Sequence, residues 1–230
     1  MQKVYKRNER GSLIVISGPS GSGKDTIVNE LVKNNDNIWV SVSCTSRAPR
    51  KGDKEGETYY FLSREEFEEK IKNNELLEYA EYNGNYYGTP KEHIEEHIKN
   101  GKDVILVIEV QGALKVKELI PWSIGIFIVP PTMTELRRRL STRGTETKEK
   151  VLERFKTAYK EINRVTDYNY VVTNDEVDEA VKKINAILLA EKCSVDRIED
   201  VYLNNEEEEI HALLMDNVNF SSADDDIRIN

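Results

Sequence analysis

A glycine-rich segment near the N-terminus, GPSGSGKDT from Gly18 to Thr26, has the residue types and spacing of a phosphate-binding loop. The pattern G-x-x-x-x-G-K lets successive backbone N–H groups surround phosphate oxygens while Lys24 reaches the terminal phosphates. The loop follows the apolar run Leu13 to Ile16 and precedes a helical pattern, so the positive end of a helix faces the same anion. We therefore predict a nucleotide site, with an ordinary glycine-rich turn as the alternative. The residues expected to line it are Gly18, Pro19, Ser20, Gly21, Ser22, Gly23, Lys24, Asp25 and Thr26.

The residue after the loop lysine departs from the usual pattern, because Asp25 stands where Ser or Thr normally holds Mg²⁺. A carboxylate beside a triphosphate is repelled unless Mg²⁺ or an arginine lies between them. Thr26 cannot replace the hydroxyl, since one step along a helix rotates the side chain by about 100°. We expect a working site in which Asp25 either reaches Mg²⁺ through water or turns aside, leaving phosphates and water to hold the metal. The sequence names no direct protein ligand for the metal.

A second arginine-bearing segment, SVSCTSRAPRKGDKEGETYYF from Ser41 to Phe61, indicates another phosphate site. Arg47 and Arg50 lie three residues apart in a Pro/Gly-rich stretch, where two guanidinium groups can converge on one phosphate. Solvated loop arginines are the alternative, and these two residues alone do not decide between them.

The surrounding pattern predicts an α/β fold with a central parallel sheet and crossover helices. Apolar runs that scarcely alternate with polar residues indicate strands buried on both faces, at residues 13–17, 104–108, 124–129 and 170–173. Apolar residues at helical spacing indicate helices at residues 24–34, 111–119, 132–142, 147–164 and 175–190. We expect Asn174 or Asp175 to cap the last of these helices.

Residues from about 42 to 91 differ from the rest, with short strands at 59–61, 76–82 and 86–87 and a hairpin turn at Asn83-Gly84. We predict a small inserted α/β lobe between core segments 11–41 and 92–190. Gly144-Thr145 separates two arginine-bearing helices, which is typical of a hinged flap, and we expect a mobile lid over about 139–164.

Charge is distributed unevenly along the chain, whose formal net charge is −9. Residues from Glu191 onward include 12 acidic and 3 basic side chains, which leaves 30 of each sign before that point. Such a neutral body lacks the basic stripe that nucleic-acid backbones need, so we expect no nucleic-acid partner. The segment 191–230 is expected to be a solvated, partly disordered acidic extension, with a short helix from Glu207 to Asp216 as the alternative.

Targeting and cysteine patterns point to a soluble cytoplasmic protein. No apolar run approaches the roughly 20 residues of a membrane span, and the N-terminus lacks the apolar stretch of a signal peptide. Cys44 and Cys193 form no C-x-x-C pair, so neither a disulfide framework nor a zinc site is indicated. Whether the chain is a monomer or a homo-oligomer is left open.

Six motifs occur together and in a fixed order: the phosphate loop, S-V-S-C-T-S-R-A-P-R, E-x-x-x-Y-Y-F, N-G-N-Y-Y-G-T, I-E-V-Q-G and R-G-T-E-T. As a set they resemble guanylate kinase, the nucleoside monophosphate kinase that phosphorylates GMP with ATP. The resemblance covers about residues 11–190. It implies a three-layer phosphate-loop fold, Mg²⁺ as cofactor and a place in purine nucleotide metabolism with GMP recycling.

The resemblance also implies a role for individual residues in binding GMP. Arg47, Arg50, Tyr59 and Tyr87 match positions that hold its phosphate, which suits a dianion. Glu78 matches the residue that accepts from guanine N1–H and the 2-amino group, donors that adenine lacks. The other matching positions are Ser43 and Thr89, which contact the base near O6, and Glu109, which faces nucleotide and metal.

For ATP, Arg139, Arg143 and Arg154 match the arginines that close on the phosphates. Together with Lys24 and Arg50 they form the expected catalytic set, because phosphoryl transfer depends mainly on positioning and charge neutralisation. No general base is required, since the attacking GMP phosphate oxygen is already ionised near neutral pH.

Two other kinds of function compete with this interpretation. A guanylate-kinase-like binding module without catalysis should lack the loop lysine or the flap arginines, yet Lys24, Arg139 and Arg154 are present. A kinase for another small phosphorylated substrate would keep the phosphate loop but not Glu78 as guanine reader.

Overall fold

The computed structural model describes residues 5–33, 35–50, 52–82, 84–141 and 148–201. The chain divides into two compact units, a larger one spanning Arg10–Glu191 and a smaller one that combines Met1–Glu9 with Lys192–Asn230. Within the described ranges, no helix has both the length and the apolar character needed to cross a membrane.

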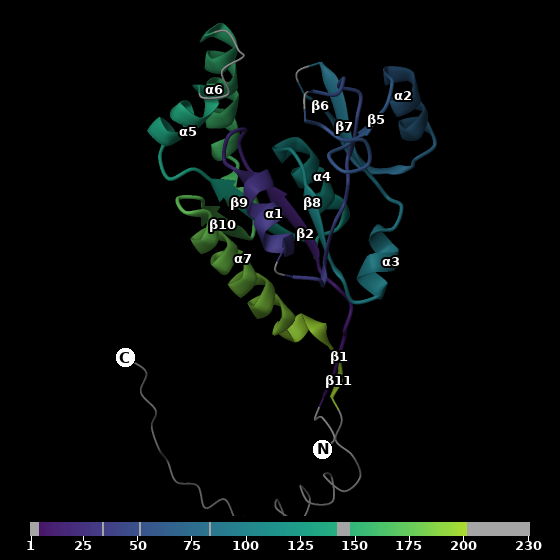
Figure 1. Ribbon diagram of the computed structural model, residues 1–230. Coiled ribbons are helices and arrows are strands. Elements are labelled where there is room, and N and C mark those ends of the chain that lie inside the picture. Colours follow the sequence, from purple (N-terminus) through teal and green to yellow (C-terminus); the bar gives the residue numbers. More distant parts are fainter. Residues whose placement is uncertain (1–4, 34, 51, 83, 142–147, 202–230) are drawn as a thin grey trace, which may run out of the picture. The chain divides into compact units, whose positions relative to one another are not determined.

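The described part of the larger unit contains a five-stranded parallel sheet in the order β10-β9-β2-β8-β3 (Figure 1). The strands are β2 (Leu13–Ser17), β3 (Ile38–Val40), β8 (Asp103–Val107), β9 (Ile124–Val129) and β10 (Tyr170–Thr173). Strand β2 pairs with β8 on one side and β9 on the other, so it lies at the centre of the sheet. The predicted α/β fold with a central parallel sheet is confirmed.

The side chains of β2 explain why its sequence is an unbroken apolar run. Ile14 and Ile16 face one core cluster, while Leu13 and Val15 face another on the opposite side of the sheet. Successive side chains of a strand point to opposite faces, so a strand covered on both faces has no position left for a polar residue.

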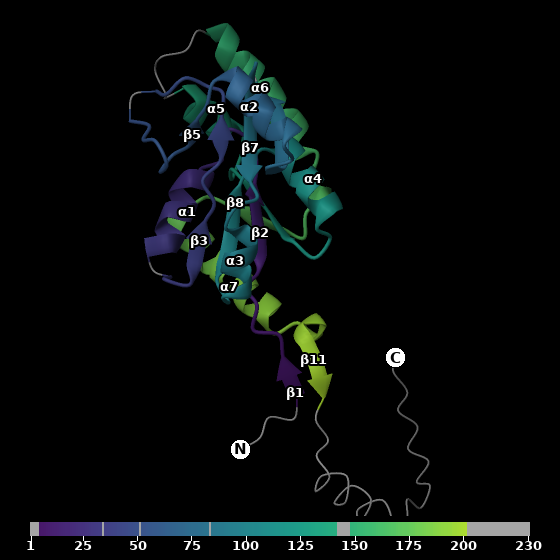
Figure 2. The ribbon, with the colours of Figure 1, turned by 90° about the vertical axis from the view of Figure 1, so that its right-hand side faces the viewer.

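Helices cover both faces of this sheet (Figure 2). They are α1 (Lys24–Lys33), α3 (Ile94–Lys99), α4 (Val110–Leu119), α5 (Met133–Ser141), α6 (Lys148–Ile162) and α7 (Val177–Lys192). Helices α1 and α7 pack on the face of the sheet to which Ile14 points, whereas α3 and α4 pack on the opposite face, to which Leu13 points. Helices α5 and α6 pack on each other through Leu136, Leu140 and Ala158.

A second, four-stranded sheet in the order β5-β4-β7-β6 corresponds to the stretch that the sequence sets apart. Its strands are β4 (Cys44–Thr45), β5 (Tyr60–Phe61), β6 (Leu76–Tyr82) and β7 (Asn85–Pro90), and the helix α2 (Arg64–Lys72) lies between β5 and β6 in the chain. Strands β6 and β7 are antiparallel and pair Tyr82 with Asn85, which puts the tight turn at the predicted place. Asn83, the first residue of this turn, lies outside the described residues. This sheet and α6 lie at the same end of the parallel sheet (Figures 1 and 2).

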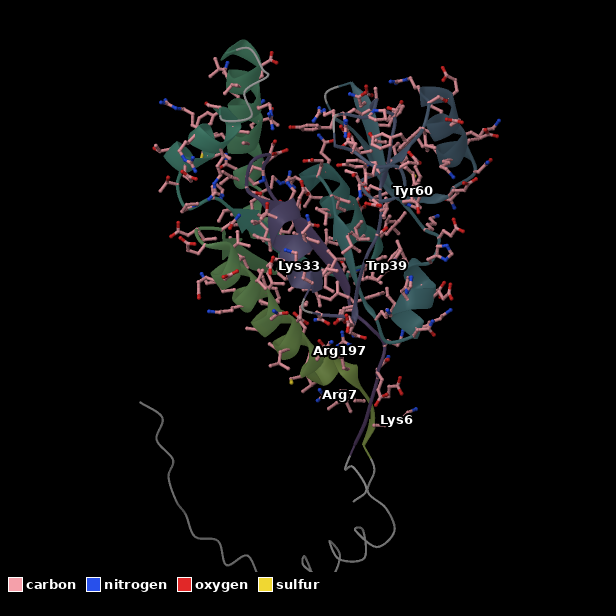
Figure 3. All side chains as sticks on the ribbon, viewed as in Figure 1. Lys6, Arg7, Lys33, Trp39, Tyr60 and Arg197 are labelled. Atoms are coloured by element: carbon pink, nitrogen blue, oxygen red, sulfur yellow. The ribbon has the colours of Figure 1, made fainter. Side chains whose placement is uncertain are left out.

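The sequence pattern does not predict the short elements α2, α3 and β3, and each omission has a physical reason. Helix α2 buries only Phe67, so it has no apolar stripe, although Ser63 and Glu66 form a capping box that marks its start. Helix α3 has six residues and β3 has three, too few to show a period. Strand β3 is nonetheless held at the sheet edge, where Trp39 (Figure 3) stacks on His97 with ring centroids 4.3 Å apart.

The smaller unit contains an antiparallel pair of strands, β1 (Tyr5–Arg7) and β11 (Ile198–Val201). Lys6 and Glu199 form an ion pair at 3.0 Å, and the Asn8 N–H donates to the Arg197 carbonyl at 2.7 Å. Part of the predicted acidic extension is therefore paired with the N-terminal strand. Its remainder, residues 202–230, lies outside the described residues, as does the alternative helix predicted there.

Candidate functional site

The phosphate loop connects β2 to α1, and its backbone explains its glycines. Gly18 has φ +146° and Gly23 has φ +91°, a region that favours glycine. A methyl group at Gly18 would lie 2.2 Å from the Ile128 carbonyl oxygen, and one at Gly23 would lie 2.3 Å from the Asn174 side-chain nitrogen. The glycine pattern therefore meets both a conformational and a packing requirement of the loop.

Two side chains from other elements hold this loop in place. The Asn174 side-chain amide donates to the Ser22 carbonyl at 2.7 Å, and this bond is buried. Arg139 of α5 donates to the Asn174 carbonyl at 3.1 Å and to the Ser22 carbonyl at 3.4 Å, and Glu135 fixes its guanidinium group at 2.8 Å. The prediction that Asn174 caps α7 was wrong, because the helix begins at Val177 and the side chain binds the loop instead. The sequence signal for this role was the position of Asn174 directly after a predicted parallel strand, where polar residues often face a ligand site.

The expected ATP-binding residues come together around this loop, with one exception. The Lys24 ammonium group donates to the Gly18 carbonyl at 2.7 Å, and the Arg154 guanidinium group donates to the Ser20 hydroxyl at 2.5 Å. Lys24, Arg139 and Arg154 thus reach the loop from α1, α5 and α6. Arg143 lies outside the described residues, as does the predicted hinge at Gly144. Asp25 and Thr26 are exposed in the first turn of α1.

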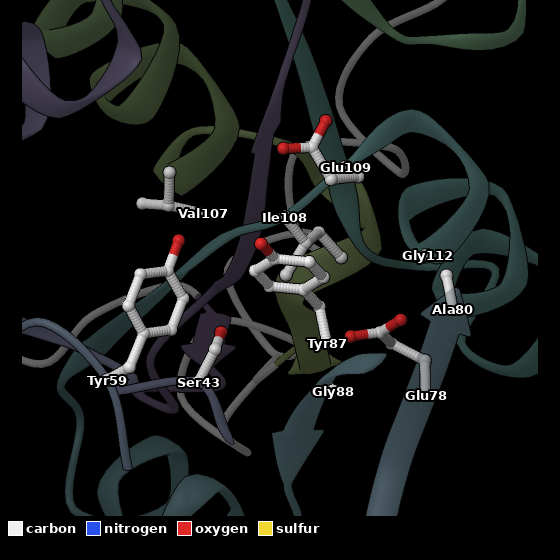
Figure 4. Close-up of a pocket in the computed structure, with 10 residues that line it drawn as sticks. All are labelled: Ser43, Tyr59, Glu78, Ala80, Tyr87, Gly88, Val107, Ile108, Glu109 and Gly112. Carbon is white, nitrogen blue, oxygen red and sulfur yellow. The ribbon is translucent and has the colours of Figure 1, made fainter. Parts of the chain in front are cut away.

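A cavity that opens to solvent lies between the small sheet and the start of α4 (Figure 4). It is lined by Ser43, Tyr59, Glu78, Ala80, Tyr87, Gly88, Val107, Ile108, Glu109 and Gly112. Five of the residues expected to bind GMP are among them, although they come from segments up to 66 positions apart. Half of the lining residues carry a carboxylate or a hydroxyl group, so the cavity can offer hydrogen bonds to a polar ligand.

Glu78 is the most buried carboxylate of the cavity, with 5% of the residue exposed. Burial raises the pKa of its carboxyl group, while a hydrogen bond from the Thr89 hydroxyl, 2.7 Å from Oε1, opposes that shift. The two residues are direct partners in the β6–β7 register. Gly112 makes room for the acid, since a methyl group there would lie 2.3 Å from Oε2. The glycine of I-E-V-Q-G is therefore required, because a side chain at this position would clash with Glu78.

The mouth of the cavity carries two phenols and an arginine. The rings of Tyr59 and Tyr87 meet edge to face with centroids 5.9 Å apart, and the Arg47 guanidinium carbon lies 5.5 Å from the Tyr59 ring centroid. Burial, and next the charge of Asp25, raises the pKa of Tyr59 to about 12. The phenol therefore stays protonated at neutral pH and can act as a donor.

Asp53 connects the two predicted phosphate-binding arginines. Its carboxylate accepts from the Arg47 guanidinium at 2.9 Å and from the Arg50 backbone N–H at 2.7 Å. The hydrogen bond from the Arg50 backbone, followed by that from the Arg47 side chain, lowers the pKa of Asp53. The structure therefore orients Arg47, whose side chain is only 10% exposed, while Arg50 lies in an exposed part of the loop.

Glu109 and Glu161 place two further carboxylates between the loop and the cavity. Glu109 follows β8 after one intervening residue and precedes α4, and its Oε2 is buried without a hydrogen-bond partner among the described residues. Glu161 lies near the end of α6, and its Oε2 is also buried without a hydrogen-bond partner among the described residues. Burial, and next the charge of Glu109, raises the pKa of Glu161 to about 7. Sequence reasoning missed Glu161, because a glutamate in a charged helix carries no distinguishing signal.

This arrangement combines an anion-binding loop with a second polar cavity at the carboxyl edge of one parallel sheet, and three cations reach the loop. The fold and the loop have the features of an α/β phosphate-loop protein, with a second cavity beside the loop.

Comparison with known proteins identifies the family. The family model for guanylate kinase matches residues 10–191. Guanylate kinase from Clostridium tetani is 58% identical over 208 residues, covering 90% of this chain and 100% of that protein. Guanylate kinase from Caldanaerobacter subterraneus subsp. tengcongensis is 52% identical, covering 88% and 98%. The crystal structure of guanylate kinase from Anaplasma phagocytophilum superimposes with a TM-score of 0.72 at 36% identity, covering 92% and 98%. The chain belongs to the guanylate kinase family.

The shifted pKa of Glu161 predicts a pH-dependent stability. Its pKa rises from 4.5 to about 7 on folding, so the folded chain binds this proton more tightly than the unfolded chain does. The resulting stabilisation is complete below about pH 4.5 and is lost as the pH rises through about 7. Glu161→Gln should therefore gain stability relative to the wild type between these values.

Urea denaturation at several pH values between 4.5 and 8.5 would measure this difference in the free energy of unfolding. The exposed Glu153→Gln on the same helix is the control and should give a flat difference. A flat profile for Glu161→Gln would show that burial does not perturb this carboxyl group.

Proposed function

We propose that the chain transfers the γ-phosphoryl group of ATP to a phosphate oxygen of GMP, which forms ADP and GDP. Its membership of the guanylate kinase family makes it a kinase. The observation that carries the proposal is the cavity beside the phosphate loop, where the buried carboxylate of Glu78 meets the phenols of Tyr59 and Tyr87. One end of this cavity suits a purine with hydrogen-bond donors, and the other suits a phosphate.

Glu78 is proposed to read the base by accepting from guanine N1–H and the 2-amino group. Adenine offers neither donor, so it would leave a buried carboxylate unpaired, which a site of this kind penalises by about 10⁴-fold or more. Thr89 already donates its hydroxyl to Glu78 at 2.7 Å, so we assign it mainly to orienting that acid. Ser43 lines the same cavity and is proposed to donate toward guanine O6.

The GMP phosphate is proposed to lie among Arg47, Arg50, Tyr59 and Tyr87. Arg47 is held in place by Asp53, and both phenols line the cavity. Arg50 is exposed and would close on the phosphate from the loop. Four donors, two of them cationic, match the charge of a phosphate dianion. The lobe of about residues 42–91 is accordingly our proposed GMP-binding lobe.

The ATP phosphates are proposed to occupy the loop Gly18–Thr26, with Lys24 on the terminal groups. Arg139 and Arg154 already contact the loop, and they would neutralise charge that develops on the transferred group together with Arg143. The segment of about residues 139–164 is our proposed lid. The attacking oxygen belongs to an ionised phosphate, so the residues need only bind, align and exclude water.

Mg²⁺ is the proposed cofactor, and when bound it would neutralise negative charge on the ATP phosphates. The carboxylate oxygen Oε2 of Glu109, buried without a partner among the described residues, fits a role in holding a hydrated cation. We propose that Glu109 would hold the ion through water, and that phosphates supply its direct ligands. In the described ranges, no three His, Cys, Asp or Glu side chains converge as a metal-binding group. A cytoplasmic location, where ATP and GMP are both present, completes the proposal.

An ADP-release assay with GMP, AMP, UMP and dTMP tests the substrate. We expect turnover with GMP alone, and Glu78→Gln should lower kcat/KM for GMP by about 10- to 100-fold, since a hydrogen bond to a charged group contributes about 1.5–3 kcal/mol. Glu81→Gln, exposed on the same strand, is the matched control. Comparable turnover of AMP by the wild type would contradict the role given to Glu78.

Removal of an arginine that reaches the loop tests the catalytic set. Arg139→Ala should lower kcat by about 10³-fold or more, because such a cation stabilises the charge of the transferred group. Arg137→Ala, an exposed neighbour on α5, should leave kcat within about twofold. Steady-state kinetics at saturating ATP and GMP give both values, and an unaffected kcat in Arg139→Ala would remove it from the catalytic set.

Asp25→Ser tests the unusual residue of the loop. We expect KM for ATP to fall by about fivefold, because the substitution removes a negative charge beside the triphosphate that is worth about 1 kcal/mol in water. Titration of Mg²⁺ at fixed ATP should shift as well. If neither ATP KM nor the Mg²⁺ dependence changes, Asp25 has no special role in the site.

A further inference from the structure

Helix α5 carries an acid that binds two consecutive arginines. The Glu135 carboxylate accepts from Nε of Arg139 at 2.8 Å, and its two oxygens accept from Arg138 at 2.7 Å each. Glu135 and Arg139 are four residues apart, so their side chains lie on one face of the helix. The hydrogen bond from Arg138, followed by that from Arg139, lowers the pKa of Glu135 to about 2, so the carboxylate is ionised at neutral pH.

Arg139 is the arginine of this pair that the structure places at the phosphate loop. Its side chain is 23% exposed, whereas that of Arg138 is 67% exposed. Arg139 donates to the Asn174 carbonyl at 3.1 Å and to the Ser22 carbonyl at 3.4 Å. Its Nη1 would lie 4.0 Å from a methyl group at Gly23. The guanidinium group therefore lies against the part of the loop that precedes α1.

Apolar side chains of the same helix support the loop from a neighbouring point. Leu136 and Leu140 are buried, and their methyl carbons would lie 3.2 and 3.1 Å from a methyl group at Gly21. Each leucine directly follows one member of the pair formed by Glu135 and Arg139. Helix α5 thus packs closely on the loop, so an arginine fixed relative to α5 is also fixed relative to the loop.

The contact with Glu135 is the strongest of the three that hold the Arg139 guanidinium group. It is the shortest of them, and it joins opposite charges, whereas Ser22 and Asn174 offer neutral carbonyl groups. An arginine side chain without such an anchor loses more rotamer freedom when it must adopt one orientation. The three contacts engage three of the five N–H donors of the guanidinium group, which leaves two for a ligand within the described part of the chain.

We propose that Glu135 is a positioning residue for phosphoryl transfer, which holds the Arg139 guanidinium group at the phosphate loop before ATP binds. The inference rests on the proposed function, in which Arg139 neutralises charge on the transferred group. A cation that is already oriented needs no reorganisation when this charge develops, so it stabilises the transition state more strongly. Glu135 itself does not need to touch ATP, because its effect on the reaction passes through Arg139.

Steady-state kinetics of variants at Glu135 test this role. Glu135→Ala should lower kcat by about 10- to 100-fold, as expected for a lost hydrogen bond between charged groups. Glu135→Gln keeps an oxygen acceptor for Nε of Arg139 and should lose at most about fivefold. KM for GMP should change by less than about twofold in both variants. Arg138→Ala removes the other partner of the same carboxylate, so it is the matched control and should keep kcat within about twofold.

A double-mutant cycle shows whether Glu135 acts through Arg139. The double variant Glu135→Ala, Arg139→Ala should have the kcat of Arg139→Ala alone, within about twofold. A purely structural role of Glu135 would instead lower kcat by the same factor in both backgrounds. Thermal unfolding should show little change for Glu135→Ala, because exposed ion pairs contribute little to stability. If Glu135→Ala does not fold, Glu135→Gln supplies the cycle.

The inference is overturned if Glu135→Ala keeps the wild-type kcat, if its loss is equal with and without Arg139, or if Arg138→Ala is equally impaired. A higher kcat in Glu135→Ala would also overturn it, since Glu135 would then restrain the arginine rather than position it. An unaffected kcat in Arg139→Ala would do the same, because no arginine would need positioning. A wild-type chain that does not phosphorylate GMP would instead contradict the proposed function, so the two failures are distinguishable.

Discussion

The hydrogen bond from the Asn174 side chain to the Ser22 carbonyl is the contact on which the rest of the site depends. It joins the end of β10 to the loop that follows β2, although the two residues are 152 positions apart. Arg139 bonds to the carbonyls of both residues, so α5 is connected to the same point. A loop rich in glycine has many backbone conformations available, and these contacts select one of them. The parallel sheet makes the contact possible, because the carboxyl ends of its strands lie along a single edge.

Opposing charges are balanced across this edge of the sheet. Lys24, Arg139 and Arg154 lie at the loop, whereas Glu78, Glu109 and Glu161 lie on the cavity side or between loop and cavity. Burial raises the pKa of both Glu78 and Glu161, so each acid is held in a place where its ionised form is disfavoured. Burial of an ionisable carboxyl group lowers the stability of the fold, and unfavourable local placements of this kind are typical of binding sites. A ligand with hydrogen-bond donors relieves the conflict at Glu78.

The register of the small sheet, rather than a flexible loop, fixes the position of Glu78. Glu78 and Thr89 are opposite each other on β6 and β7, so a hydroxyl orients the carboxylate from a fixed distance. The absence of a side chain at Gly112 of α4 leaves the space that the carboxylate occupies. Elements of the small sheet and of the main sheet therefore share one cavity, and its lining is complete only when both are folded.

The sequence alone determined the central sheet, the phosphate loop and the division of the chain into a core and an inserted sheet. These features follow from local rules: buried parallel strands need continuous apolar runs, and a loop around phosphate needs glycine and lysine at fixed spacing. The likeness to guanylate kinases also pointed to Glu78, Tyr59 and Glu109, and the structure places these residues on one cavity, while their roles in binding remain predictions. Only the tertiary structure decided that Asn174 holds the loop rather than capping α7, and that Arg154 of α6 donates to the Ser20 hydroxyl. The physical reason is that both contacts join residues more than 130 positions apart in the chain. They form at an edge of the sheet that exists only after the strands have paired. No local sequence pattern encodes which side chains meet there.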